Sequence, residues 1–378
     1  MDCTKVKVVC VDCRYIGNKP SGIGEVTWGL VHYLPQLSPN LYFKFLRNAG
    51  QSEPLSTAPN VSEIPLTAPA NSPQTMWWLP RVVDLSDVDL FHAPFNILPA
   101  GLSMKTVTTV HDIMWLTNPE WCNPGLYGHI ERRFYANGIG RALEQSDAIA
   151  TVSSATKNAI VSHRPECGSR IHVTRSGVSD RFRRVDLQSE TLRAIGLGPD
   201  QKFILTTGQF APYKNHEGAV EAFARAFGER DDVDLVMVQR RNAGAQKLQS
   251  LARRRGVEAR VHFTGEVNFD TLLELYSGAA ALLHPSFCEG FGNPLAEAMA
   301  CGCPVITSNV SAMPEVTGEA ALLVDPNDTA QIAAALTKLV NDQDLAGKMR
   351  AQGLARAQEL SWEGFAADNL AIYRKLLA

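Results

Sequence analysis

The chain has 378 residues, of which 45% are hydrophobic, and its formal net charge at pH 7 is −3. This length exceeds one ordinary hydrophobic core, so we expect two domains, and the hydrophobic fraction excludes a mainly disordered chain. The small negative charge gives no global attraction to nucleic acid or to anionic membranes. No apolar run approaches the roughly 20 residues that a membrane-spanning helix needs.

The N-terminus and the cysteines indicate a cytoplasmic protein. The opening stretch MDCTKVKVVCVDC carries charged residues and continues into a predicted strand with alternating residue types, which differs from a signal peptide. Cys10 and Cys13 form a C-x-x-C, but they lie in and just after a predicted strand, whereas redox pairs normally begin a helix. Cys301 and Cys303 have no second ligand pair at zinc spacing, so we expect no structural zinc.

The first half of the chain alternates short β-branched runs with helical stretches. A strand is predicted over residues 7–11, followed by a glycine turn and a helix over 25–34. Residues 50–76 are rich in Pro, Ser, Ala and Thr and predict a long surface loop. Further strands are predicted over residues 41–46, 90–92, 106–111, 148–152 and 171–173.

A second series begins near residue 202, and each of its strands is followed by a helical stretch. Its strands are predicted over residues 203–207, 235–238, 261–263, 281–283, 305–307 and 321–323. The pattern predicts two tandem Rossmann-like, doubly wound α/β domains, residues 1–182 and 183–361, that face a central cleft. Such sheets bind ligands at the carboxyl ends of their strands.

The most informative stretch is EGFGNPLAEAMA, residues 289–300. A helix is predicted over 294–300, and the backbone N–H groups within residues 291–295, of which Pro294 has none, would form an N-terminus that favours an anion. Glu289 lies in the preceding loop and Glu297 about one turn inside the helix. Carboxylates accept bidentate hydrogen bonds from vicinal diols, so the two could span a nucleotide-sugar. In isolation, a capping glutamate and an exposed helical glutamate would explain the same pattern.

Three other segments place chemically useful residues after predicted strands. Lys214 follows a strand in FILTTGQFAPYKN, where it can neutralise a diphosphate. VTTVHD ends a strand with His111 and Asp112, and SGIGE, with Gly22 and Gly24, opens a helix after the first strand. Each signal is weak alone, but together they lie at the strand ends of both predicted sheets.

These motifs resemble those of the retaining glycosyltransferases of family 4, which have two Rossmann-like domains (the B-type glycosyltransferase fold, GT-B). Their E-x7-E is matched by Glu289 and Glu297, their lysine segment by residues 212–215, and their glycine loop by residues 21–25. His111 matches their strand-end histidine, and MPEVTGEAALLVDP is similar to the family as well. FHAPFNILPA, together with the glycine loop, is similar to bacterial polysaccharide mannosyltransferases.

The resemblance implies roles in binding a nucleoside-diphosphate sugar. Glu297 would bind the ribose, and Glu289 would bind hydroxyls of the donor sugar. The backbone N–H groups of Phe291, Gly292 and Asn293 would face the sugar or the diphosphate.

Other implied roles concern the diphosphate, the reaction centre and the base. Lys214 would neutralise the diphosphate, and Gly22 and Gly24 would let it approach the backbone. His111 would contact the donor sugar near the reaction centre, and the base would lie against residues 261–266.

The chain departs from the family at the expected second cation of the diphosphate site. The family often has an arginine beside the lysine, where this chain has Gln209 and Tyr213. Arg14, Arg240 and Arg241 are the candidate replacements.

Retention without an obvious nucleophile suggests a front-face reaction, in which the leaving diphosphate takes the proton of the acceptor. The triplets Asp87-Val88-Asp89 and Asp232-Val233-Asp234 each precede a predicted strand, at the amino edge of a sheet. We therefore expect no metal, and no cofactor beyond the sugar donor.

The N-terminal domain is expected to bind the acceptor, and the C-terminal helix, residues 362–377, is expected to pack back on it. Residues 129–141 and 164–184 are basic, and Trp77 and Trp78 lie near the Pro-rich stretch. Such a face would suit a lipid-diphosphate acceptor and peripheral contact with the inner face of the plasma membrane. A solvated basic face with core tryptophans would explain the same residues.

The favoured function is transfer of a hexose from a nucleoside-diphosphate sugar to a saccharide or lipid-linked saccharide acceptor. GDP-mannose is the expected donor. A nucleotide-sugar epimerase or a sugar phosphorylase on the same fold, and a noncatalytic nucleotide-sugar-binding protein, stay open as alternatives. A dinucleotide oxidoreductase is discounted because position 27, where its third glycine would stand, is Thr.

Overall fold

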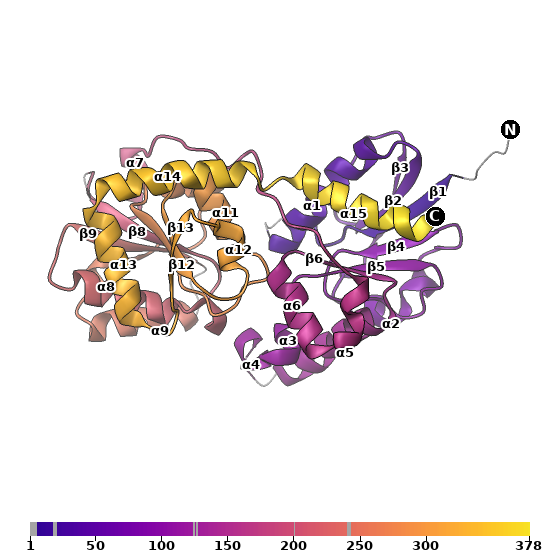
Figure 1. The fold of residues 1–378 in the computed structure, drawn as a ribbon, viewed down its shortest axis with the longest axis horizontal. Helices are drawn as coiled ribbons and strands as arrows, with labels where there is room; N and C mark the ends of the chain where they lie inside the picture. The colour runs from indigo at the N-terminus through magenta and orange to yellow at the C-terminus, as the bar shows by residue number, and fades with distance from the viewer. Residues whose placement is uncertain (1–5, 18–20, 124, 126–127, 200, 240–242) are drawn as a thin grey trace. The chain divides into compact units, whose positions relative to one another are not determined.

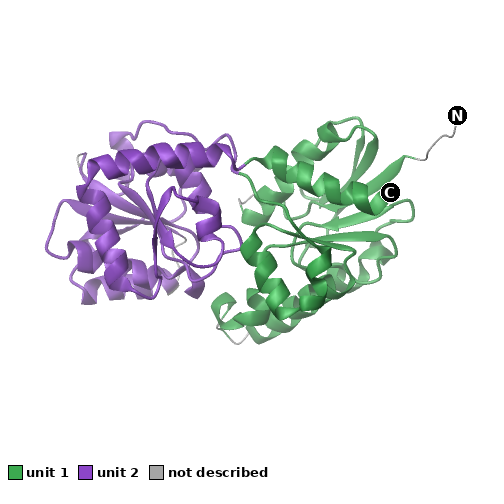
Figure 2. Cartoon of the chain, viewed as in Figure 1, with its two compact units in different colours: residues 1–177, 361–378 green, residues 178–360 purple. Residues whose placement is uncertain are grey.

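The computed structural model describes residues 6–17, 21–123, 125, 128–199, 201–239 and 243–378 (Figure 1). The chain divides into two compact units (Figure 2). Unit 1 comprises Met1–Gly177 and Ser361–Ala378, and unit 2 comprises Val178–Leu360. Each unit is built on one parallel sheet, which confirms the predicted tandem α/β domains.

Unit 1 contains a seven-stranded parallel sheet in the order β3-β2-β1-β4-β5-β6-β7. Chain order reverses between the neighbouring strands β1 and β4, which makes their carboxyl ends the switch point of this sheet. The strands are β1 (Lys7–Asp12), β2 (Leu41–Asn48), β3 (Val61–Leu66), β4 (Leu90–Ala93), β5 (Lys105–Val110), β6 (Ala148–Thr151) and β7 (Ile171–Val173).

Unit 2 contains a six-stranded parallel sheet in the order β10-β9-β8-β11-β12-β13, with its switch point between β8 and β11. Its central strands are buried on both faces, which is why they read as continuous apolar runs in the sequence. The strands are β8 (Lys202–Thr207), β9 (Val233–Val238), β10 (Val261–Phe263), β11 (Ala281–His284), β12 (Val305–Ser308) and β13 (Ala321–Val324).

Helices connect these strands in both units. Unit 1 has α1 (Gly22–Leu37), α2 (Pro73–Val82), α3 (Met114–Thr117), α4 (Pro119–Cys122), α5 (Gly128–Gln145), α6 (Ser154–His163), the 3-10 helix η1 (Pro165–Arg170) and α15 (Trp362–Leu377). Unit 2 has α7 (Ser189–Ala194), η2 (Pro212–Lys214), α8 (His216–Phe227), α9 (Ala243–Arg254), η3 (Glu258–Arg260), α10 (Phe269–Gly278), α11 (Asn293–Ala300), α12 (Met313–Thr317), α13 (Thr329–Asn341) and α14 (Gln343–Gln358).

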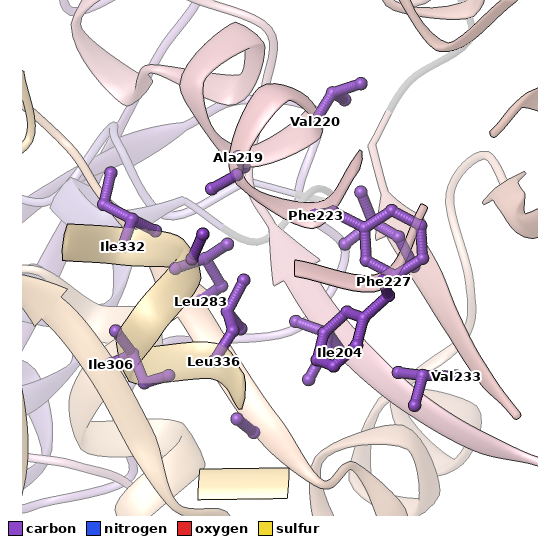
Figure 3. Packing of buried hydrophobic residues seen from close by; sticks show 14 of the residues in the cluster. Ile204, Ala219, Val220, Phe223, Phe227, Val233, Leu283, Ile306, Ile332 and Leu336 are labelled. Carbon is purple, nitrogen blue, oxygen red and sulfur yellow. The ribbon is translucent and has the colours of Figure 1, made fainter. Parts of the chain in front are cut away.

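The core of unit 2 shows how helical spacing becomes packing. Phe223 and Phe227 lie one turn apart on α8, so they project from the same side of the helix. Both are fully buried with Ile204 of β8 and Val233 of β9 (Figure 3). This packing holds α8 against the sheet and thereby fixes the loop that precedes it.

The prediction of a surface loop over residues 50–76 is wrong. Residues Val61–Leu66 form β3, which pairs in parallel with β2 at the edge of the sheet. An edge strand needs no continuous apolar run and tolerates a proline such as Pro65, so its sequence lacks the usual signal. The helix α2 also begins inside this stretch, with Ser72 as N-cap and Pro73 in the first turn.

The two units divide slightly before the predicted boundary at residue 182. Unit 1 ends at Gly177, and the chain returns to it at Ser361. The Val178 N–H donates to the Leu360 carbonyl at 3.0 Å, so the two connecting segments run side by side. A hydrogen bond between segments so far apart in sequence leaves no local signal, which explains the difference.

The last helix, α15, belongs to unit 1 and packs against α1 (Figure 1). Its Tyr373 is fully buried, and the Tyr373 hydroxyl is hydrogen-bonded to Nδ1 of His92 on β4. Nε2 of His92 is hydrogen-bonded to the Thr109 hydroxyl on β5 at 2.8 Å. Burial lowers the pKa of His92 to about 3, so the ring is neutral at pH 7 and serves as a structural link.

We expect Tyr373→Phe to lower the free energy of unfolding by about 1–3 kcal/mol, because it leaves a buried ring nitrogen without a partner. Urea unfolding of the full chain, followed by circular dichroism, measures this change. Tyr42→Phe on the half-buried face of β2 is the matched control and should change stability much less. Equal effects of the two substitutions would contradict a structural role for the His92 link.

Candidate active site

The loops that leave β8 and β11 lie together at the switch point of unit 2. They are joined by a hydrogen bond from the Phe287 N–H to the Tyr213 carbonyl at 2.7 Å. The Asn215 side chain donates to the carbonyls of Pro285 and Pro326, at 3.1 and 2.9 Å, and caps α8. The asparagine of the PYKN segment thus ties together the loops after β8, β11 and β13.

Lys214 and Glu289 meet within this pair of loops. Lys214 Nζ lies 2.7 Å from Glu289 Oε1, and only 9% and 8% of the two residues are exposed. The structure therefore brings together two predicted site residues that are far apart in the sequence. Their contact was not predicted, because the sequence suggested separate ligands for the two, the diphosphate and the sugar.

Both members of this ion pair are charged. Burial alone would raise the pKa of Glu289, but Lys214 and His284 outweigh it and lower the pKa to about 2. Burial would lower the pKa of Lys214, but the Glu289 carboxylate reverses that effect and raises it. A full positive charge and a full negative charge are thus held at this edge of the sheet.

A cradle of polar side chains fixes the Glu289 carboxylate. His284 Nε2 and the Ser286 hydroxyl lie 2.8 and 2.9 Å from the same oxygen, Oε1, that Lys214 contacts. Burial lowers the pKa of His284, so its ring is a neutral donor to this oxygen. Within the described residues no donor reaches the second oxygen, Oε2, which leaves that oxygen to accept from a ligand.

The backbone of Glu289 is fixed as well, by Ser311. The Ser311 hydroxyl accepts from the Glu289 N–H at 3.1 Å and donates to the Glu289 carbonyl at 2.8 Å. Ser311 has a φ of 56°, a left-handed conformation that is uncommon for residues other than glycine, asparagine and aspartate. Backbone strain of this kind persists where the surrounding structure requires it, often at functional sites.

The helix α11 begins beside this pair, as the sequence predicted. Its N-cap is Gly292, whose φ of 97° is readily available only to glycine. Within the part of the chain that the structure describes, the backbone N–H groups of Phe291, Gly292 and Asn293 donate to no protein acceptor. These groups, at the positive end of the helix dipole, suit a phosphate or a sugar oxygen.

Glu297 lies half-buried on α11, one turn beyond its start. The hydroxyl of the buried Tyr276 on α10 donates to Glu297 Oε2 at 2.8 Å. The same hydroxyl lies 3.2 Å from the Thr207 hydroxyl at the carboxyl end of β8. Tyr276 therefore links Glu297 to the end of β8 and orients its carboxylate.

In unit 1, His111 directly follows β5 and is half-buried. Its Nε2 is hydrogen-bonded to the Pro94 carbonyl at 2.9 Å, and its backbone N–H donates to the Asn96 side chain at 2.7 Å. A carbonyl can only accept, so Nε2 carries the proton and Nδ1 is the acceptor of the neutral ring. Burial lowers the pKa of His111, which favours this neutral form.

The glycine loop of unit 1 forms the start of α1. Ser21 is the N-cap, and its hydroxyl accepts from the Gly24 N–H at 3.0 Å. A Cβ on Gly24 would lie 2.9 Å from the Ser21 hydroxyl and 3.2 Å from the Tyr15 carbonyl, so the turn has no room for a side chain. Gly22 is exposed as the first residue of α1.

Arg14 cannot supply the missing second cation, which corrects one hypothesis drawn from the sequence. Its guanidinium pairs with Asp12 at 2.6 Å and donates to the Ala68 carbonyl and the Thr75 hydroxyl. Both charged side chains are fully buried, so these contacts are structural. The other two candidates, Arg240 and Arg241, lie outside the described residues.

The structure also shows the two residues that stand where the family often has an arginine. Gln209 is exposed after β8, and the Tyr213 ring lies 5.2 Å from Lys214 Nζ, within reach of a cation–π contact. Neither brings a positive charge to the site.

The two acidic triplets serve the amino ends of strands. Asp89 accepts from Lys7 and from the Val8 N–H, and Asp87 pairs with Lys44. In the second triplet, Asp232 pairs with Arg230 at 2.7 Å, and Asp234 lies 2.9 Å from His262. These contacts explain the carboxylates without any ligand.

The segment predicted to hold the base borders a hollow of unit 2. A cavity of about 620 Å³ is lined by residues of β10, including His262 and Phe263, and by Thr264, Asn268 and Thr271. The base contact itself stays a prediction.

Sequence reasoning missed four residues of the site. His284 and Ser286 were visible signals, because they follow β11 at the strand end where functional groups gather. Tyr276 and Ser311 gave no such signal, since a tyrosine within a helix and a serine within a loop are both common. Their roles arise from which elements pack together.

Two family models together match most of the chain. Residues 20–182 match "Glycosyltransferase Family 4", and residues 188–356 match "Glycosyl transferases group 1". The chain is 31% identical over 289 residues to "O-antigen chain mannosyltransferase B" of Escherichia coli, covering 76% of this chain and 74% of that protein. It is 27% identical to the "Serotype-specific mannosyltransferase WbdA" of Escherichia coli, of whose length it spans 35%.

Solved structures of low sequence identity share the fold. A glycosyltransferase from Rickettsia africae matches with a TM-score of 0.73 at 17% identity, over 99% of both chains. WaaG, a glycosyltransferase involved in lipopolysaccharide biosynthesis, matches with a TM-score of 0.71 at 19% identity, over 96% of this chain and 99% of WaaG.

Fold and site together define a glycosyltransferase with the GT-B fold. More narrowly, the chain belongs to the family-4, group-1 glycosyltransferases, as its motifs indicated.

The buried ion pair predicts a strongly non-additive mutant cycle. We expect Lys214→Met or Glu289→Gln alone to cost about 3–5 kcal/mol of unfolding free energy, because each leaves the other charge or its partners unpaired. The double variant should cost less than the sum of the two, as measured by urea unfolding.

The same pair predicts a pH dependence. The pKa of Glu289 is depressed from 4.5 to about 2, so its stabilisation is present above pH 4.5 and is lost as the pH falls toward 2. The double variant should show a shallower loss over this range. Additive costs and identical acid profiles would contradict the pairing.

Ser311 gives a test of positioning. We expect Ser311→Ala to weaken binding of a nucleoside-diphosphate sugar about tenfold, because Glu289 loses both backbone hydrogen bonds, each worth roughly 1 kcal/mol. Calorimetry measures the affinity, and Ser250→Ala, on the exposed face of α9, is the control. A fall in melting temperature with unchanged affinity would mean that Ser311 only stabilises the fold.

Proposed function

We propose that this protein is a retaining hexosyltransferase that moves mannose from GDP-mannose to a saccharide or lipid-linked saccharide during polysaccharide or glycolipid synthesis. The observation that carries the proposal is the Lys214–Glu289 pair beside the N-terminus of α11. A donor of this class carries a diphosphate, a ribose and a hexose. Cation, helix N-terminus and two carboxylates match those groups in kind.

The diphosphate is the leaving group, and its growing negative charge needs stabilisation. Lys214 and the N–H groups of Phe291, Gly292 and Asn293 supply positive charge and donors without a metal or other cofactor. When the diphosphate binds, Lys214 shares its three N–H donors between the phosphate and Glu289. Glu289 keeps His284 and Ser286 as donors, so its carboxylate stays oriented.

The proposed reaction proceeds on one face of the sugar. The bond between the anomeric carbon and the diphosphate oxygen breaks, and the acceptor oxygen forms the new bond on the same face. The acceptor proton passes to the departing diphosphate oxygen, so no side chain has to become a nucleophile. Glu289 Oε2 accepts from a sugar hydroxyl, and Glu297 accepts from the ribose.

His111 then acts as a neutral group. Its Nε2–H is used by the Pro94 carbonyl, so Nδ1 is the atom that can accept from a donor-sugar hydroxyl. This contact would orient the sugar at the reaction centre, and Gly22 and Gly24 would admit the diphosphate at the start of α1.

The choice of mannose rests on relatives. The two Escherichia coli proteins described above are named mannosyltransferases, and one is named for the O-antigen chain. These names support mannose as the donor sugar and a saccharide chain as the acceptor. A cytoplasmic enzyme at the inner face of the plasma membrane would meet both.

Donor binding is the first test. Calorimetry and thermal shift with GDP, UDP, ADP, TDP and their sugar conjugates, in excess chelator, should show selective binding of GDP and GDP-mannose. Selective binding of another nucleoside diphosphate and its sugar conjugate would contradict GDP-mannose as the donor. Activity that is lost in chelator and restored by Mg²⁺ or Mn²⁺ would overturn metal independence, and an inverted anomeric centre in the product, seen by NMR, would overturn retention.

Two substitutions test the site. Glu297→Ala should weaken donor binding about tenfold or more, because it removes a charged hydrogen-bond acceptor. His111→Ala should lower turnover about tenfold or more through loss of orientation, with donor affinity changed less. The exposed residues His163 and Glu229 give matched alanine controls. Wild-type kinetics for both site variants would refute the assignment.

A further inference from the structure

Unit 1 exposes large apolar side chains on two neighbouring helices. Among the described residues, eight large hydrophobic side chains are exposed, and four of them lie on α2 and α5. They are Trp77, Trp78 and Val82 on α2, exposed by 39%, 46% and 44%, and Ile130 on α5, exposed by 67%. The Trp77 ring packs edge-to-face against Phe134 of α5 at 5.9 Å, so the two helices present one continuous surface.

Cations share this surface. Arg81 lies one turn after Trp77 on α2, and Arg133 lies one turn after Ile130 on α5. Both arginines are exposed, and the described chain shows no ion pair for either. We name the surface formed by Trp77, Trp78, Arg81, Val82, Ile130 and Arg133 the α2–α5 surface.

We propose that the α2–α5 surface binds the headgroup region of an anionic lipid bilayer. Tryptophan prefers this region because its ring is amphipathic, and a guanidinium matches a lipid phosphate in geometry and charge. Each basic residue near such a membrane adds attraction, whereas the chain as a whole is slightly negative. No described helix is long and apolar enough to cross a membrane, so the contact is interfacial.

A second copy of this chain suits the surface less well. A two-fold interface brings the same patch of both copies together, so Arg81 and Arg133 would meet like charges. The exposed tryptophans would be buried in that arrangement, but the arginines would gain no partner. A bilayer with anionic headgroups satisfies both kinds of side chain.

The surface is linked to the predicted reaction centre by aromatic rings. Phe134 lies 5.3 Å from Tyr135, and Tyr135 stacks on Trp115 at 4.7 Å. Trp115 belongs to α3, which directly follows the loop that carries His111, and α2, α3 and α5 all lie in unit 1 (Figure 1). Presentation of a lipid-linked acceptor along this path rests on the proposed function, whereas bilayer binding does not.

Vesicle co-sedimentation of the full chain tests the proposal. Wild type should bind vesicles of phosphatidylcholine with phosphatidylglycerol, bind phosphatidylcholine alone at least tenfold more weakly, and lose affinity as salt rises. Trp77→Ser/Trp78→Ser should weaken binding about tenfold. Trp28→Ser is the matched control, because Trp28 is an equally exposed tryptophan, at 41%, on α1.

A charge variant tests the surface independently of the tryptophans. Arg81→Gln/Arg133→Gln should weaken binding to the anionic vesicles about tenfold, while Lys247→Gln/Lys348→Gln removes the same charge from exposed positions of unit 2 and should have no effect. Circular dichroism confirms that each variant is folded. The proposal is overturned if either surface variant binds the anionic vesicles as tightly as the wild type does, or if the wild type binds equally well without phosphatidylglycerol. It is also overturned if the wild type is a dimer in solution and the surface variants are monomers.

The outcome is separable from the proposed function. Both surface variants should bind the nucleotide-sugar as wild type does and should transfer sugar normally to a water-soluble acceptor. Failure of donor binding in the wild type would refute the transferase and leave the vesicle result standing. Loss of donor binding in the surface variants would instead show that these helices shape the donor site, which would contradict a separate membrane surface.

Discussion

The site of unit 2 depends on one buried ion pair, Lys214 with Glu289. Placing two charges at the edge of a sheet, largely out of water, is costly unless each is paired and hydrogen-bonded. The fold meets that requirement with His284 and Ser286 on the carboxylate and with Ser311 on the backbone of the same residue. Because the charges are already paired and oriented, the proposed binding of a diphosphate would need little reorganisation, which is the condition for effective electrostatic stabilisation.

Both units apply the same topological rule with different chemistry. Each sheet reverses its chain order beside its first strand, so the connections that leave the two neighbouring strands lead to opposite sides of the sheet. Unit 2 places a charged pair and a helix N-terminus there, which suit an anionic donor. Unit 1 places a tight glycine-led helix start after β1, at its switch point, and the neutral His111 after the nearby strand β5. Arg14, which was the candidate second cation in unit 1, is buried in an ion pair with Asp12.

The motif residues divide into those that contact ligand in the proposal and those that hold the site together. Asn215 of the PYKN segment is structural, since its side chain bridges three loops, whereas Lys214 beside it provides charge. Tyr276 holds Glu297 in a similar supporting role. A motif in the sequence does not distinguish these two kinds of residue. The hydrogen bonds in the structure do, because the polar atoms of the supporting residues bind other parts of the protein.

The sequence by itself determined the two α/β domains, nearly every strand, and the positions of Glu289, Glu297, Lys214 and His111 in the segments that follow strands, because hydrophobic periodicity and turn residues act locally. It misread β3 because an edge strand lacks an apolar run, and the boundary that it gave at residue 182 lies slightly after that of the compact units because the Val178–Leu360 pairing is long-range. Only the tertiary structure decided that Lys214 and Glu289 are partners, that Ser311 and Tyr276 support the carboxylates, and that Arg14 is unavailable. Those outcomes depend on distances between residues remote in the chain, which packing sets and local pattern does not.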